Sequence, residues 1–112
     1  MSRKLERQEW QGYFDRVSRG LEDVRAELAV SGLAGLGDQI AAEWIPLIGI
    51  TYDRKDDLVD LALDPLDHMI RKPREISVDE SGASLASVEV VDGDNVHHIA
   101  RFREPLPLPG AR

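Results

Sequence analysis

The stretch from Ile40 to Leu63 constrains the fold most, because it is the most apolar part of the chain and its apolar residues alternate. Alternate residues of a strand face opposite sides of a sheet. The even-numbered side chains of its first part are all apolar or aromatic: Ile40, Ala42, Trp44, Pro46, Ile48, Ile50 and Tyr52. The polar run Asp53–Asp56 is suited to a four-residue turn. We therefore predict a long strand, a turn and a return strand, with the even-numbered side chains in the core.

The register of this hairpin follows from the return strand. With that turn, Ile50 lies opposite Val59, and a shift by one residue would turn Asp60 toward the core. Pro46 has no N–H to donate to a ladder, and Gly49 suits a β-bulge or a sharp bend. We therefore expect a coiled strand that bends around the core.

Ile45 and Leu47 lie on the other face of this strand and need a cover of their own. Either the C-terminal strands curl over them, or they form a small apolar patch for a partner chain.

Residues from about 6 to 19 predict an amphipathic helix. One apolar stripe recurs at helical spacing: Trp10, Tyr13, Phe14, Val17 and Leu21. Gly20 stands where a left-handed cap would end the helix. A helix of this length is marginal alone, so we expect its aromatic stripe to pack against a sheet.

The rest of the chain predicts further strands. Residues 24–30 alternate like a half-buried strand, and the glycine-rich segment 31–39 predicts a loop without the spacing of a dinucleotide fingerprint. After Pro73, residues 76–78 indicate a short strand, and residues 83–102 indicate a second hairpin around Gly93-Asp94.

Together these elements predict a single domain over residues 1–112 of the α+β class. One N-terminal helix (about 6–19) packs on a strongly curved, mainly antiparallel sheet of five to six strands. The sheet spans about 24–102 and resembles a half-barrel, and the proline-rich tail 103–112 is expected to fray.

Composition excludes several functions. The chain has no cysteine, which rules out disulfides, thiolate metal sites and cysteine catalysis. Its net charge of −7 argues against nucleic acid as a partner. No run reaches the about 18 apolar residues of a membrane span, and the N-terminus does not read as a secretory signal. We expect a soluble, cytoplasmic protein without a membrane partner and without a cofactor.

The three histidines do not predict a metal site. His97 and His98 are neighbours in a strand, so they point to opposite faces and cannot readily share one ion. His68 can meet one of them only by long-range folding, with Asp67 or Glu89 completing a site. The predicted second hairpin also places Glu89 across from His98 as a polar pair.

Glu43 is the titratable residue of most interest, because it stands between Ala42 and Trp44 in the most apolar strand. A buried carboxylate there would have a raised pKa and could bind a cation or act as a general base. The alternative is a glutamate on the solvent face of the strand, beside Ala41.

Three function classes remain open. One is a minor enzyme that uses Glu43 and His68, which requires these two side chains within hydrogen-bond reach, directly or through one water. Nothing in the sequence asks for an enzyme, so the other two classes are non-enzymatic. The leading hypothesis is a non-enzymatic accessory or protein-interaction module that self-associates through Ile45, Leu47 and neighbouring strand edges. The alternative is a small-ligand-binding domain with a pocket between helix and sheet, lined by Trp44, Tyr13 and Glu43. A homodimer, a protein partner and a small molecule are all compatible with the sequence. The candidate residues for the pocket or interface are Glu43, Trp44, Ile45, Leu47 and His68.

Four segments, residues 5–18, 36–63, 67–80 and 88–102, resemble a family of short uncharacterised bacterial proteins. The resemblance covers nearly the whole chain, and the segment 36–63 is its most specific part. It implies a bacterial single-domain protein whose family has no known function. No catalytic or binding residue carries over from it.

Overall fold

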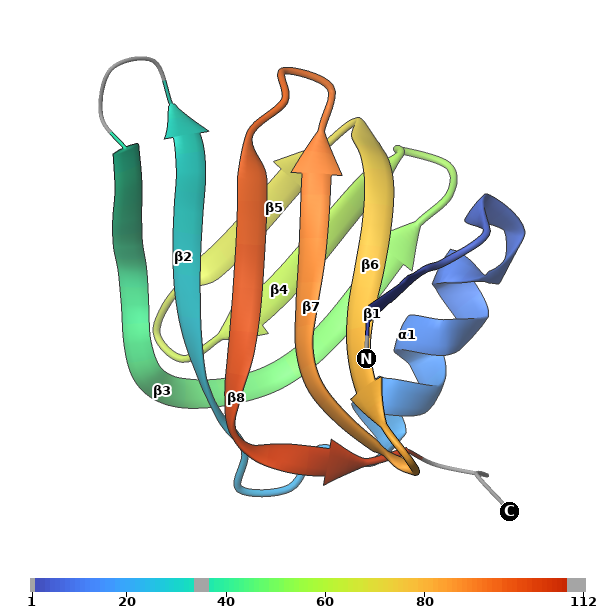
Figure 1. The fold of residues 1–112 in the computed structure, drawn as a ribbon, viewed down its shortest axis with the longest axis vertical. Helices are drawn as coiled ribbons and strands as arrows, with labels where there is room; N and C mark the ends of the chain where they lie inside the picture. The colour runs from blue at the N-terminus through green and yellow to red at the C-terminus, as the bar shows by residue number, and fades with distance from the viewer. Residues whose placement is uncertain (1, 34–36, 109–112) are drawn as a thin grey trace.

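The computed structural model describes residues 2–33 and 37–108, without the side chains of residues 33, 37 and 38. These residues form one α-helix, preceded by a 3-10 turn, and eight strands rather than the predicted five to six (Figure 1). The elements are β1 (Ser2–Lys4), η1 (Arg7–Glu9), α1 (Trp10–Arg19), β2 (Arg25–Leu33), β3 (Gly37–Asp53), β4 (Leu58–Leu63), β5 (Asp67–Arg71), β6 (Pro73–Ser81), β7 (Ser84–Asp92) and β8 (His97–Pro107). The strands pair in the antiparallel order β1-β6-β7-β8-β2-β3-β4-β5, so the α+β prediction is confirmed. The helix that the structure describes is too short to cross a membrane.

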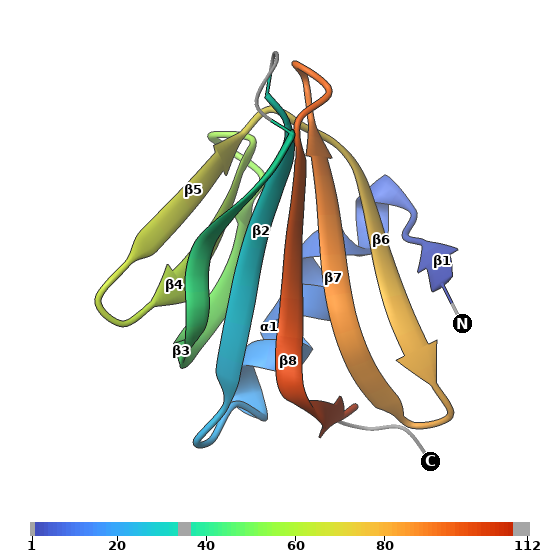
Figure 2. The ribbon, with the colours of Figure 1, turned by 60° about the vertical axis from the view of Figure 1, so that its left-hand side comes forward.

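The long strand β3 organises the sheet, because its two halves pair with different neighbours. Its first half pairs with β2 and its second half pairs with β4. The sheet consequently folds at β3 into two arms, one of β2, β8, β7, β6 and β1 and the other of β3, β4 and β5 (Figure 2). The predicted bend in this strand is confirmed.

The helix α1 links the two arms at the side of β3 that pairs with no strand in residues 2–33 and 37–108. The Ser18 hydroxyl donates a hydrogen bond to the carbonyl oxygen of Ile50 (2.6 Å) and accepts one from the Ile50 N–H (2.9 Å). From the same helix, the Tyr13 hydroxyl donates to Oε2 of Glu80 on β6 (2.5 Å). The helix therefore satisfies backbone groups on the free edge of β3, which a strand would otherwise pair.

The apolar stripe of α1 is buried as predicted. Its buried members are Trp10, Tyr13, Phe14 and Val17. They pack into one core with inward-facing residues of both arms. The predicted left-handed cap at Gly20 is wrong, because its φ is −96°. The helix ends in a tight turn in which the Gly20 N–H donates to the Val17 carbonyl (3.0 Å).

The central hairpin is present, but its turn begins one residue later than predicted. Ile50 lies opposite Leu61, two residues from the predicted partner, so the parity is kept and both side chains are buried. The cause is the side chain of Asp53, whose Oδ1 accepts hydrogen bonds from the N–H groups of Lys55 (2.9 Å) and Asp56 (3.2 Å). This aspartate turn places the loop at residues 54–57.

The prediction that all even-numbered side chains of β3 face inward is wrong for part of the strand. A bulge between Leu47 and Gly49 reverses the alternation, so Leu47 is buried and Ile48 is 63% exposed. Ile40, near the start of β3, is also exposed. Pro46 and Gly49 predicted a bulge here. The prediction did not include that a bulge reverses which side chains of the preceding residues point into the core.

Three further expectations need correction. The predicted loop 31–39 is largely strand, apart from residues 34–36, which lie outside the described residues. The second hairpin shifts by one residue, so Val90 rather than Glu89 lies opposite His98. The strand β5 was not predicted at all.

The proline-rich tail is ordered as far as the structure describes it. Leu106 is buried opposite Leu85, and the Leu108 N–H donates to the Ala83 carbonyl (2.8 Å). Because Pro105 and Pro107 alternate with these leucines, the missing proline N–H groups do not interrupt this pairing. Residues 109–112 lie outside the described residues.

Candidate functional site

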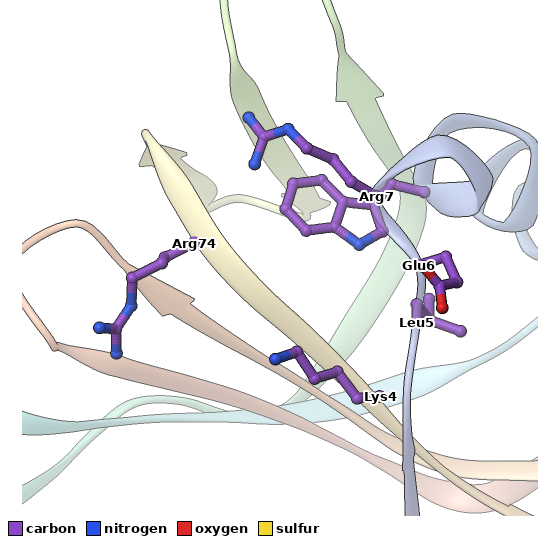
Figure 3. A pocket seen from close by; sticks show the side chains of 6 residues that line it. Lys4, Leu5, Glu6, Arg7 and Arg74 are labelled. Carbon is purple, nitrogen blue, oxygen red and sulfur yellow. The ribbon is translucent and has the colours of Figure 1, made fainter.

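A hollow of about 380 Å³ lies between the start of the helix and the β1–β6 edge of the sheet. Its lining consists of Lys4, Leu5, Glu6, Arg7, Trp10 and Arg74. Three of these side chains are cationic and come from different elements, Lys4 from β1, Arg7 from η1 and Arg74 from β6 (Figure 3). The hollow thus gathers positive charge in a chain whose net charge is −7.

Local sequence places these groups together. The Leu5 side chain is buried and its N–H donates to the Ile76 carbonyl (2.8 Å), so the chain stays attached to β6 just past the end of β1. Glu6 and Glu9 then form a capping box, in which the Glu6 N–H donates to Oε2 of Glu9 (2.8 Å). This box starts the 3-10 turn that carries Arg7.

The Arg7 guanidinium makes three contacts within the protein. Its guanidinium lies over the Trp10 ring, 4.6 Å from the ring centroid. Its Nη2 donates to Oδ1 of Asp57 (2.9 Å), and its Nη1 donates to the Pro73 carbonyl (3.4 Å). The same Asp57 oxygen accepts from the Tyr52 hydroxyl (2.7 Å). This wall of the hollow is therefore cationic and fixed in geometry.

Lys4 and Arg74 are held more loosely. The Lys4 Nζ lies 3.0 Å from Oε1 of Glu75, and the Arg74 Nη2 lies 3.7 Å from Oε2 of the same carboxylate. Hydrogen bonding from Lys4 lowers the pKa of Glu75. Such exposed ion pairs contribute little free energy.

The Trp10 side chain lines the hollow, but its indole N–H is buried. Trp10 is 2% exposed, and its Nε1 is buried without a hydrogen-bond partner among the described residues. Buried N–H groups in folded proteins are nearly always paired. The Trp10 N–H, beside the basic hollow, is therefore an unusual buried donor.

A second constellation connects the two arms of the sheet. His68 Nε2 on β5 lies 2.9 Å from His98 Nδ1 on β8, and His98 Nε2 lies 2.9 Å from Oδ2 of Asp92. His68 therefore does meet another histidine by long-range folding. Its acidic neighbour is Asp92, whereas Glu89 contacts His97 on the other face (2.5 Å).

The Asp92 carboxylate, at one end of the chain from His68 through His98 to Asp92, decides which ring nitrogens donate. The Asp92 carboxylate accepts from His98 Nε2–H, which leaves Nδ1 of a neutral His98 to accept from His68 Nε2–H. Burial lowers the pKa of His68, which favours the neutral form of this ring. Among the described residues no hydroxyl bonds to this chain, and no group of three or more histidine or acidic side chains is placed to hold a metal. The hydrogen-bonded chain of His68, His98 and Asp92 joins the two arms of the sheet.

Comparison with known proteins identifies the family of this sequence. The profile of a family of unknown function (DUF5335) matches residues 1–111. The chain belongs to this family. An uncharacterised protein from Aquifex aeolicus (strain VF5) is 35% identical over 109 residues, which cover 96% of this chain and 97% of the relative. No solved structure matches the chain. The resemblance to a family of uncharacterised proteins is thus confirmed.

The five candidate residues predicted from the sequence do not form one common site in this DUF5335 protein. Glu43 is exposed, Trp44 and Ile45 are half-buried, and Leu47 is buried. His68 is half-buried and bonds to His98, with no hydrogen bond to Glu43. None of these five residues lines the basic hollow. Glu43 therefore has the solvent-facing role that was its alternative interpretation.

Sequence reasoning missed the cations of the hollow. Lys4 and Arg7 flank the aromatic stripe, and this local basic cluster in an acidic chain was the available signal. Arg74 is about 70 residues away in sequence and comes close only because β1 pairs with β6.

A carboxyl pair on β4 and β5 gives a pH-dependent prediction. Burial, followed by a hydrogen bond with Asp67, raises the pKa of Asp60 to about 6. Asp60 Oδ1 is also buried without a partner among the described residues. Because the folded pKa is raised, the protonated form stabilises the fold at low pH, and this stability is lost as the pH rises through about 6.

Asp60→Asn should therefore increase the free energy of unfolding at pH 7.5, because the amide stays neutral and can donate to Asp67. The advantage over wild type should shrink toward zero at pH 4.5, where Asp60 is itself protonated. Urea unfolding at both pH values measures this difference. A substitution that destabilises the protein equally at both pH values would contradict the raised pKa of Asp60.

Proposed function

We propose that this DUF5335 protein binds a small, multiply charged anion, carrying phosphate or several carboxylate groups, in the hollow beside Trp10. The observation that supports the proposal is the convergence of Lys4, Arg7 and Arg74 around one cavity. Three cations line one hollow of a chain whose net charge is −7, and their acidic partners Asp57 and Glu75 do not line it.

The arrangement favours an anion with more than one charged group. Arg7 supplies a fixed guanidinium, and a planar fork of N–H donors matches carboxylate and phosphate oxygens. Lys4 and Arg74 are largely exposed and change partner easily. The Glu6 carboxylate also lines the hollow, and its side chain accepts a backbone N–H within its capping box. A preorganised cation with two adaptable ones keeps the ordering cost of binding small.

This proposal corresponds to the small-ligand alternative from the sequence, with different residues around the pocket. It also locates the pocket between helix and sheet, at Trp10 rather than at Trp44. Trp10 itself is too deeply buried to stack against a ligand. Recognition therefore rests on charge and hydrogen bonding, which favours small anions over large aromatic ones.

Isothermal titration with pyrophosphate, inorganic phosphate and citrate at constant ionic strength tests the proposal. The double variant Lys4→Gln/Arg74→Gln should weaken binding of the tightest of these anions by about tenfold or more, because it removes charge-assisted hydrogen bonds. The matched control, Lys55→Gln/Arg103→Gln, removes the same charge from exposed positions that do not line this hollow. Equal weakening in both double variants, or no binding by wild type, would contradict the proposal.

The protein-interaction module predicted from the sequence is the second candidate. Ile45 packs against the protein's own core and Leu47 is 4% exposed, so these two residues offer little surface to a partner. The observation that favours interaction is instead the unpaired edge of β5.

A further inference from the structure

We propose that β5 pairs with β5 of a second copy of this chain, antiparallel about a twofold axis at Met69, to form a homodimer. The proposal is independent of anion binding. No residue of β5 is among the residues that line the hollow.

The free edge of β5 carries unpaired backbone groups. Among the described residues β5 pairs only with β4. The Leu63 N–H donates to the Leu66 carbonyl and the Lys72 N–H donates to the Asp57 carbonyl, which identifies the hydrogen-bonded pairs of this ladder. Because these pairs alternate along an antiparallel ladder, residues 67, 69 and 71 direct their N–H and C=O groups away from β4.

Those residues match a second copy of themselves. In an antiparallel pair centred on Met69, each Met69 lies opposite its counterpart and each Asp67 lies opposite the Arg71 of the other copy. All three positions are hydrogen-bonded pairs in this register, so each pair exchanges two backbone hydrogen bonds. The three side chains are exposed on one face, with Met69 at 49%. The contact is therefore complementary in backbone, in charge and in apolar surface.

Charge also explains why this edge, and not the other, pairs with itself. Charged residues usually protect an edge strand against association. On β5 the two charges have opposite signs and stand at equal distances from the centre, so twofold pairing brings unlike charges together. On the opposite edge, β1 carries Arg3 and Lys4 with no acid, so its self-pairing would oppose like charges.

Sedimentation velocity over a range of concentrations tests the dimer. Wild type should show a reversible monomer–dimer equilibrium. Arg71→Glu places two acids at each end of the contact, and Asp67→Lys places two bases there, so each variant alone should self-associate at least about tenfold more weakly. Arg103→Glu, an exposed change of equal charge on β8, should leave the dimer unchanged.

The decisive sample is an equimolar mixture of Arg71→Glu and Asp67→Lys. In a mixed dimer both ends again pair unlike charges, so dimers should reappear at wild-type concentrations. A wild type that stays monomeric, single variants that dimerise like wild type, or a mixture that stays monomeric while circular dichroism shows both chains folded, would each overturn the proposal.

Discussion

Replacing Trp10 with alanine should lower the free energy of unfolding by about 3–5 kcal/mol. Trp10 is among the largest fully buried side chains of the core. Its ring meets the Tyr52 ring edge-on, with centroids 5.1 Å apart and planes at 88°, and it carries the Arg7 guanidinium on its face. The substitution would leave a cavity where the helix, the hairpin and the basic hollow meet. For a domain with about 5–15 kcal/mol of stability, that loss is a large fraction.

Trp44→Ala is the matched control, because it removes the same side chain from a half-buried position. Its backbone also has a positive φ of 53°, which no L-residue adopts without strain and which alanine does not relieve. We expect this variant to cost about 1–2 kcal/mol, as for partial burial of an aromatic ring. Urea unfolding followed by far-ultraviolet circular dichroism compares the two. A larger loss at Trp44 would mean that the core is centred on the strand rather than on the helix.

Asp92→Ala should give the second large effect, a loss of about 2–4 kcal/mol at pH 7.5. Its Oδ2 accepts from His98, and its Oδ1 accepts from the N–H groups of Asp94 (2.8 Å) and Val96 (3.1 Å). One carboxylate therefore shapes the β7–β8 turn and satisfies a histidine that is only 7% exposed. Alanine would leave all three donors without that acceptor.

The size of this effect should depend on pH in a defined direction. Burial raises the pKa of Asp92, but hydrogen bonds from His98 and from backbone N–H groups outweigh it and hold the pKa below the ordinary value. A lowered folded pKa contributes stability above the unfolded-state value near 3.8, and that stability is lost as the pH falls through the lower folded pKa. The difference between wild type and Asp92→Ala, from unfolding curves at pH 7.5 and pH 3, should shrink in acid. A difference that grows in acid would contradict the carboxylate's role as acceptor.

Repeating patterns in the sequence predicted the elements, whereas single side-chain contacts decided their registers. The aromatic stripe of α1 and the alternation of β3 were enough to predict a helix on a curved antiparallel sheet. Asp53 and Asp92 each bond to backbone N–H groups of their own turn, and each turn displaced the strand that follows. No periodicity in the sequence carries this information. The same pattern led us to place Trp44 in the core, but the bent strand leaves it half-buried.

The strand β5 and the candidate site escaped prediction for a different reason. The five residues of β5 stand between Pro65 and Pro73, and three of them are charged or histidine, so they read as a turn. The hollow forms only after β1 pairs with β6, a contact between residues about 75 apart in the sequence. From the sequence, His68 could meet another histidine only by long-range folding. The unpredicted strand β5 brings it to His98.

The two tryptophans allow the most direct measurement of where an anion binds. Each indole N–H gives its own signal in a nitrogen–proton correlation spectrum, and Trp10 lines the basic hollow while Trp44 does not. On titration with pyrophosphate at constant ionic strength, the Trp10 indole signal should shift and saturate, and the Trp44 signal should stay in place. A Trp10 signal that does not move, or two signals that move together, would contradict anion binding beside Trp10.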